Sequence, residues 1–237
     1  MKQIIFLLCA FAASALGQTG RITGAVVDDS GTPIQGARVA ASLWSSAKPV
    51  PFVAGRPPAF MPVPASALTG SKGEFEVSGL HAGKYYVCVE KPEAAILNPC
   101  LWADPPASVD VGEGAAVSGI SVVAANGVTL NIRVQDAKGL LGANPASDDV
   151  RVGTSHRRSP FIPGIVSGRD PAGKVMSVIV PRGQAATVSV SSASFALSDE
   201  RGAALAGTEI SVPAEVVASA GAAPVVTVRV TDVKPRP

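Results

Sequence analysis

The sequence is poor in charge, and this limits the partners that it can attract electrostatically. Only 16% of its 237 residues are charged, and 20 Lys and Arg residues nearly balance 18 Asp and Glu residues. Such a chain gives no electrostatic reason to expect a nucleic acid or an anionic membrane as a partner. The one basic cluster, at 156–158, is typical of a solvated loop.

Histidine is scarce too, which weakens the case for an enzyme. His81 and His156 are the two histidines, and no HExxH motif is present. Ser155 precedes His156, but adjacent side chains of an extended chain point apart, and a catalytic triad also needs a positioned acid. The acidic pairs at 28–29 and 148–149 are typical of turns, although such carboxylates can also bind calcium. We predict no enzyme, no catalytic residue, no metal and no cofactor.

Long apolar runs are missing as well, and the longest lies at the N-terminus. Residues 1–17 carry Lys2, an apolar run from Ile4 to Phe11, and small residues before Gln18. The run is shorter than the about 20 residues of a transmembrane helix and is typical of a secretory signal peptide. Cys9 as a lipid attachment site is a weaker alternative because it lies inside the apolar run. We predict a secreted protein, periplasmic or extracellular, with no transmembrane segment after cleavage.

Cysteine is rare, and export determines what the remaining pair does. Signal cleavage would leave Cys88 and Cys100 alone in an oxidising compartment, where a disulfide is the favoured interpretation. On the chain-entropy model so short a loop adds roughly 3 kcal/mol of stability. A catalytic thiol or a metal site is the alternative, but no histidine adjoins either cysteine and no second pair completes a zinc site.

Glycine and proline, by contrast, are abundant, and they favour an all-β fold. The 24 glycines and 20 prolines leave little room for long helices. In GSKGEFEVSGLHAGKYYVCVE, at 70–90, polar and apolar residues alternate on both sides of a turn between Gly79 and Gly83. The pattern predicts a hairpin whose inward-facing residues are Phe75, Val77, Tyr85, Val87 and Val89.

An earlier segment, 21–44, predicts a second hairpin of the same kind. Asp28, Gly31 and Pro33 supply typical turn residues between its strands. Its predicted inward-facing residues are Ile22, Gly24, Val26, Val39, Ala41 and Leu43.

The two segments together resemble the carboxypeptidase regulatory-like domain. The matching residues are Gly24, Val26, Asp28, Gly31, Pro33, Ile34, Gly36, Ala37 and Val39, followed by Thr69, Gly73, Phe75, Val77, Gly79, Leu80, Gly83, Tyr85 and Val87. The resemblance covers about residues 20–90 and implies a transthyretin-like β-sandwich, also grouped with carbohydrate-binding-like folds, in a non-catalytic accessory role. Two features depart from the family pattern: His81 stands where proline is usual, and a Pro-rich insert occupies 47–66.

Aromatic residues outside the inward-facing set are the candidates for ligand contact. They are Trp44, Phe52, Phe60, Tyr86 and Trp102. Aromatic faces supply a large contact area, so these residues favour a polysaccharide or another extracytoplasmic protein as the partner. For the aromatics of the insert, the preferred interpretation is that they fold back and cap the sandwich, with ligand contact as the alternative.

The second half of the chain repeats the first in a faded form. Val134, Asp136 and Gly139 match Val26, Asp28 and Gly31, while Gly173 and Gly183 are spaced like Gly73 and Gly83, with Val175 in the place of Phe75. Such spacing predicts a second, degenerate sandwich that ends in a strand with Val226, Val228 and Val230 on one face. Residues from 104 to 119 supply a linker, although Val109, Val111, Ile120 and Val122 resemble strand residues.

These patterns lead to one architecture and three functional hypotheses. We predict two tandem antiparallel β-sandwich domains after the signal peptide at 1–17, the first at 18–123 and the second at 124–237. The favoured function is a secreted, non-catalytic binding module, with carbohydrate as the ligand class that the resemblance suggests. A purely structural envelope spacer is the alternative, and an uncharacterised hydrolase is a weaker one.

Overall fold

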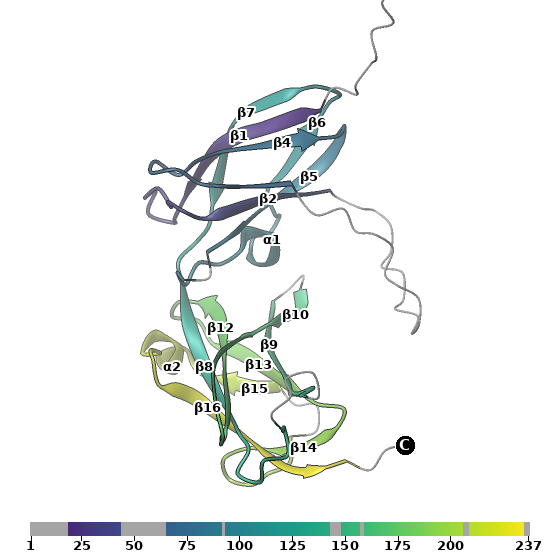
Figure 1. The fold of residues 1–237 in the computed structure, drawn as a ribbon. Helices are drawn as coiled ribbons and strands as arrows, with labels where there is room; N and C mark the ends of the chain where they lie inside the picture. The colour runs from purple at the N-terminus through teal and green to yellow at the C-terminus, as the bar shows by residue number, and fades with distance from the viewer. Residues whose placement is uncertain are drawn as a thin grey trace, which may run out of the picture.

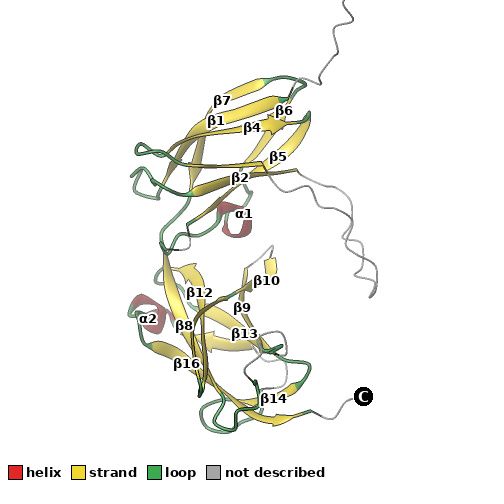
Figure 2. Ribbon diagram, in the orientation of Figure 1, coloured by secondary structure: helices red, strands yellow, loops and turns green. Residues whose placement is uncertain are grey.

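The computed structural model describes residues 19–43, 65–91, 93–142, 148–156, 159–205 and 209–234. Its strands form two β-sandwiches arranged one after the other along the chain (Figures 1 and 2). Two short helices accompany them, α1 at Pro99–Trp102 and α2 at Ala214–Ala218. Within the described residues, no helix is long and apolar enough to cross a membrane. The predicted signal peptide lies outside the described residues.

The first sandwich packs a three-stranded sheet on a four-stranded sheet. The three-stranded sheet has the order β4-β1-β7, formed by Glu74–Leu80, Gly20–Val27 and Ala116–Val123. The four-stranded sheet has the order β3-β2-β5-β6, formed by Ala65–Leu68, Arg38–Leu43, Gly83–Glu90 and Ser108–Val111. The predicted insert 47–66 is therefore two residues too long, because Ala65 and Ser66 belong to β3. Its other residues lie outside the described ranges.

The second sandwich packs a five-stranded sheet on a four-stranded sheet. The order of the larger sheet is β11-β12-β8-β16-β14, formed by Ile165–Asp170, Gly173–Pro181, Gly127–Gln135, Pro224–Val233 and Phe195–Ser198. The order of the smaller sheet is β10-β9-β13-β15, formed by Ser159–Pro163, Arg151–His156, Ala186–Ser191 and Glu209–Val212. The strand order of the first sandwich recurs here, with β11 and β14 added at the edges.

Most strand pairs are antiparallel as predicted, but each sandwich contains one parallel pair. β1 pairs in parallel with β7, from Arg21 opposite Ala116 to Val27 opposite Val123. β8 pairs in parallel with β16 in the equivalent place. A parallel pair needs a long crossover, and in both sandwiches nearly the whole domain lies between the two strands. Local alternation carries no information about a partner so distant in sequence.

The two predicted hairpins are wrong, because each pair of consecutive strands is divided between the two sheets. β1 pairs with β4, and β2 pairs with β5. The chain therefore arches from one sheet to the other after β1 and again after β4. Alternation specifies which face of a strand is buried. A hairpin, which joins strands of one sheet, and an arch, which joins strands of two facing sheets, bury the same side chains, so alternation does not distinguish them.

The core of the first sandwich contains most of the residues that alternation predicted to face inward. The buried residues are Ile22, Val26, Val39, Ala41, Phe75, Val77, Tyr85, Val87 and Val89, together with Val109, Val111 and Val122. Gly24 and Ile120 are partly buried. Leu43 was predicted to face inward but is 54% exposed, since it is the last residue of β2 and lies at the rim of the core. The predicted linker at 104–119 is wrong where β6 and part of β7 occupy it, and the accompanying prediction that Val109, Val111, Ile120 and Val122 are strand residues of the first sandwich is confirmed.

The core of the second sandwich preserves the pattern with different residues. Val134, Met176, Val178, Val228 and Val230 are buried within it. Val175 was predicted to occupy the position equivalent to Phe75. In the structure Phe75 pairs with Gly24, and the residue that pairs with the equivalent position in β8, Ile132, is Met176. Val175 is only partly buried, so the predicted correspondence is displaced by one residue.

The repeat is clearest at two glycines at the start of equivalent strands: Gly73 directly precedes β4, and Gly173 is the first residue of β12. Gly73 has φ +74° and Gly173 has φ +137°, both in the region that disfavours side chains. A Cβ atom on Gly73 would lie 2.3 Å from the carbonyl oxygen of Val26, and one on Gly173 would lie 2.0 Å from that of Val134. Because the backbone comes similarly close at the same place in both halves, glycine is required at both positions, although the surrounding core residues differ.

Candidate functional site at the junction of the two sandwiches

The chain passes directly from the last strand of the first sandwich into the central strand of the second. β7 ends at Val123 and β8 begins at Gly127. The backbone N–H of Leu97 donates to the carbonyl of Ala125 at 2.8 Å, and that of Gly127 donates to the carbonyl of Ala95 at 2.6 Å. The short connection is thus held on one side by the segment that precedes α1.

The turn between β1 and β2 holds the connection on the other side. The amide nitrogen of the Asn126 side chain donates to Asp29 at 2.8 Å and to Asp28 at 3.1 Å. Asp28 also accepts hydrogen bonds from the Ser30 hydroxyl and the Thr32 backbone N–H, which together lower its pKa to about 2. These acids stabilise a turn and the junction, as the turn interpretation predicted.

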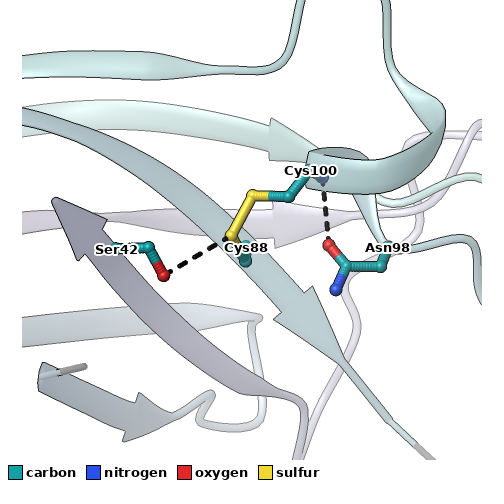
Figure 3. The surroundings of a disulfide bond; sticks show 4 residues. All are labelled: Ser42, Cys88, Asn98 and Cys100. Atoms are coloured by element: carbon teal, nitrogen blue, oxygen red, sulfur yellow. Dashed lines mark hydrogen bonds between the residues drawn. A yellow bond between two sulfur atoms is a disulfide. The ribbon is translucent and has the colours of Figure 1, made fainter. Parts of the chain in front are cut away.

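The predicted disulfide joins Cys88 to Cys100 and fixes α1 on the outer face of β5 (Figure 3). Cys88 alternates with the buried residues Val87 and Val89, so its side chain leaves the core. The side chain of Asn98 caps α1 by accepting a hydrogen bond from the backbone N–H of Cys100 at 3.0 Å. The disulfide prediction is confirmed.

Trp102 ends α1 and lies at the junction rather than on an open loop. Its ring centroid is 4.8 Å from that of His156 in β9, with the two planes tilted by 37°. The indole is partly buried and packs against the core of the second sandwich. The disulfide-bonded segment of one sandwich therefore reaches the other through this side chain.

A hollow of about 330 Å³ opens beside this contact. Segments from both sandwiches line it, among them Asp29, Trp102, Asn126, His156, Arg182 and Gln184. Arg182 and Gln184 are exposed residues of the turn between β12 and β13. Within the part of the chain that the structure describes, the Arg182 guanidinium, the Gln184 amide and the Trp102 indole N–H take part in no hydrogen bond or ion pair. Three donor groups without a partner among the described residues therefore line the hollow, two of them on solvent-exposed side chains.

Tyr86, the other predicted aromatic that the structure describes, does not line this hollow. Tyr86 is partly buried on the outer face of β5, between Ser42 and Ser108 in the strand ladders. Trp44, Phe52 and Phe60 lie outside the described residues. Of the two predicted aromatics that the structure describes, Trp102 lines the hollow, and its neighbours Arg182 and Gln184 were not predicted. Turn residues such as Arg182 carry no sequence signal that separates a site from an ordinary loop.

His81, the other histidine, makes its structural contact through the backbone. The backbone carbonyl of His81 accepts a hydrogen bond from the Tyr85 hydroxyl at 2.9 Å. The described residues contain no group of three metal-binding side chains.

Asp148, in one of the predicted acidic pairs, forms an ion pair inside the second sandwich. Lys174 lies 2.8 Å from it and Arg169 lies 2.9 Å from it, and the Asp148 side chain is only 1% exposed. Burial opposes ionisation of Asp148, but the hydrogen bonds from Lys174 and Arg169 outweigh it and lower the pKa. The sequence did not predict this pair, because a lysine directed into the core contradicts simple alternation.

No protein-family model and no curated protein sequence matches the chain. A streptococcal ancillary pilin matches with a TM-score of 0.37 and 14% identity, over 92% of this chain and 63% of the pilin. Catechol 1,2 dioxygenase from Acinetobacter radioresistens matches with 0.29 and 12%, over 48% of this chain and 54% of the enzyme. A shaft pilin from Lactobacillus rhamnosus GG matches with 0.30 and 10%, over 92% of this chain and all of the pilin, 100%.

The chain spans less than two thirds of the length of the ancillary pilin and of the dioxygenase. All three TM-scores are below 0.5. Likenesses this distant carry no argument about a family or a function.

Proposed function

We propose that this chain is an extracytoplasmic, non-catalytic binding module whose domains, 18–123 and 124–237, contact a saccharide in the hollow at their junction. The observation that carries the proposal is the set of uncommitted donors in that hollow. Arg182, Gln184 and the indole N–H of Trp102 lack partners among the described residues. Few convergent polar groups in a concave site are the usual basis of ligand specificity.

A saccharide fits this arrangement because its hydroxyl groups both donate and accept hydrogen bonds. The donors of Arg182 and Gln184 match acceptor oxygens, while Asp29, also in the lining, supplies an acceptor. The apolar ring of Trp102 adds contact area that a sugar ring can cover. The resemblance to the carboxypeptidase regulatory-like domain agrees with a non-catalytic role and stays a prediction.

The test is a fluorescence titration of the oxidised protein with the Trp44→Phe change, so that Trp102 is the reporter. The ligands are maltotriose, cellotriose, a chitin trimer and soluble peptidoglycan fragments. We expect a saturable change in emission with at least one of them. Arg182→Gln should weaken binding about tenfold or more, since a hydrogen bond to a charged group contributes about 1.5 to 3 kcal/mol.

Arg201→Gln is the matched control, because Arg201 is also an exposed turn arginine that precedes a glycine. It lies between β14 and β15 and does not line the hollow. An equal loss of affinity in both arginine variants would show non-specific charge binding and reject the site. Saturation by no saccharide would reject the proposed function.

A structural spacer is the second candidate, and the ties between the sandwiches favour it. Asn126 bonds the connection to the first sandwich, and Trp102 packs the first sandwich against the second. A rigid spacer predicts that the angle between the domains stays fixed whether or not saccharide is present. Small-angle scattering with and without the best ligand measures this. The export prediction has its own test, since the secreted protein should begin at Gln18 when its N-terminus is sequenced.

A further inference from the structure

A pulling force applied along the chain would pass through both parallel strand pairs. The chain enters the first sandwich at the start of β1 and leaves it at the end of β7. It enters the second at the start of β8 and leaves it at the end of β16, at the opposite end of the molecule (Figure 1). In each sandwich the entering strand and the leaving strand are direct neighbours in one sheet.

Because these neighbours are parallel, tension makes them slide past one another. The ladder runs from Arg21 opposite Ala116 to Val27 opposite Val123. A force on the start of β1 and an opposite force on the end of β7 act along the strands, across the direction of the ladder hydrogen bonds. All the bonds then share the load and must break together. Opposite forces at the same end of both strands would instead break the bonds one by one.

We propose that each sandwich is a mechanical clamp and that the chain bears tension between whatever is attached to its two ends. Load would pass from β1 to β7, through residues 124–126 into β8, and from β8 to β16. The hydrogen bond from the backbone N–H of Ala124 to the carbonyl of Val27, at 2.9 Å, extends the first ladder to the connection. The other strands lie outside this path. This function goes beyond saccharide binding and does not depend on it.

The centre of each clamp is shielded from water. Val26 pairs with Val122, and these residues are 0% and 1% exposed. The equivalent pair in the second sandwich, Val134 with Val228, is fully buried at 0% for both residues. Water cannot readily replace ladder hydrogen bonds at such positions, and a low local dielectric strengthens them.

Single-molecule force spectroscopy on the full chain, held by handle proteins fused to its two ends, tests the proposal. Two unfolding steps are expected, one for each sandwich. The disulfide spans 12 positions, so reduction should lengthen one step by about 40 Å at about 3.5 Å per residue. That lengthening identifies the step of the first sandwich.

The pulling geometry provides the first control. Moving the second handle to Glu113, an exposed residue before β7, loads the same ends of β1 and β7 and should separate them one bond at a time. The unfolding force of the first sandwich should fall several-fold, because the load then acts on one hydrogen bond at a time and not on the whole ladder between β1 and β7. Equal forces in the two geometries would overturn the proposal.

Two matched core variants provide the second control. Val122 lies in the clamp and Val87 lies in β5, outside the load path, yet both are 1% exposed in the same core. Val122→Ala should lower the unfolding force, whereas Val87→Ala should leave it near the original value even where urea denaturation shows a similar loss of stability. Equal reductions in force would show that resistance follows overall stability and would reject the clamp.

Discussion

Removing the Cys88–Cys100 disulfide should destabilise the first sandwich by about 3 kcal/mol. The bond joins residues 12 positions apart, and the chain-entropy model gives roughly this value for so short a loop. A domain of about 100 residues shifts its melting temperature by about 4 °C or more for each kcal/mol, so we expect a fall of about 12 °C or more. The double change Cys88→Ser with Cys100→Ser removes the bond without leaving a free thiol.

The loss should be confined to one of two unfolding transitions. Neither cysteine belongs to the core of the second sandwich, so its own transition should keep its midpoint. Trp102 should nevertheless become more mobile, because α1 loses its covalent tie to β5.

Urea denaturation followed by circular dichroism and by Trp102 fluorescence, with Trp44→Phe present in both proteins, measures these effects. Each transition is fitted separately, since a two-domain chain is not two-state as a whole. Oxidised protein treated with a reductant is the second comparison. An unchanged first midpoint would refute the entropic reasoning, and equal shifts in both transitions would refute the assignment of the bond to one sandwich.

Three further predictions concern the ion pair and the close-approach glycine. Lys174→Met should cost up to about 3 kcal/mol in the second sandwich, because it removes the buried partner of Asp148 and leaves only the more exposed Arg169 beside that carboxylate; adding Asp148→Leu should recover part of the loss in urea denaturation. The pKa of Asp148 is below its ordinary value of 3.8, so ionised Asp148 stabilises the second sandwich above about pH 4, and this stabilisation should be lost as pH falls further. Urea denaturation at pH 5 and at pH 3 should therefore show a smaller drop in the free energy of unfolding for the Lys174→Met variant than for the original protein. Gly73→Ala should destabilise more than Gly79→Ala in the same assay, because both have positive φ but only Gly73 would place Cβ against the Val26 carbonyl.

The sequence carries enough information to predict the buried faces of the strands, but not their neighbours. Alternation identified Val77 and Val87 as core residues, because apolar side chains at every second position mark the face of a strand that is buried. It could not place β4 and β5 in different sheets, because that choice is made by packing across the core. It also could not reveal the parallel pairing of β1 with β7, which depends on contacts between residues roughly 95 positions apart.

The candidate site was predictable only in part, for the same physical reason. The disulfide follows from an even pair of cysteines and an export signal, both of which are local features. The position of Trp102 at the junction depends on how α1 is held and on which strand of the second sandwich lies opposite. Arg182 and Gln184 enter the hollow through a turn that is ordinary in sequence, so composition and periodicity could not single them out.

The parallel pairing of β1 with β7 also determines when the first sandwich can finish folding. β1 has β4 as one neighbour, but its other edge stays open until residues 116–123 arrive. Closing so long a loop is entropically slow, and an unfinished sheet edge can recruit a strand from another molecule. The same holds for the second sandwich, where one edge of β8 stays unpaired until residues 224–233 of β16 have been synthesised. A growing chain therefore carries an incomplete sheet for most of its synthesis, and its solubility during that interval depends on whatever shields these edges.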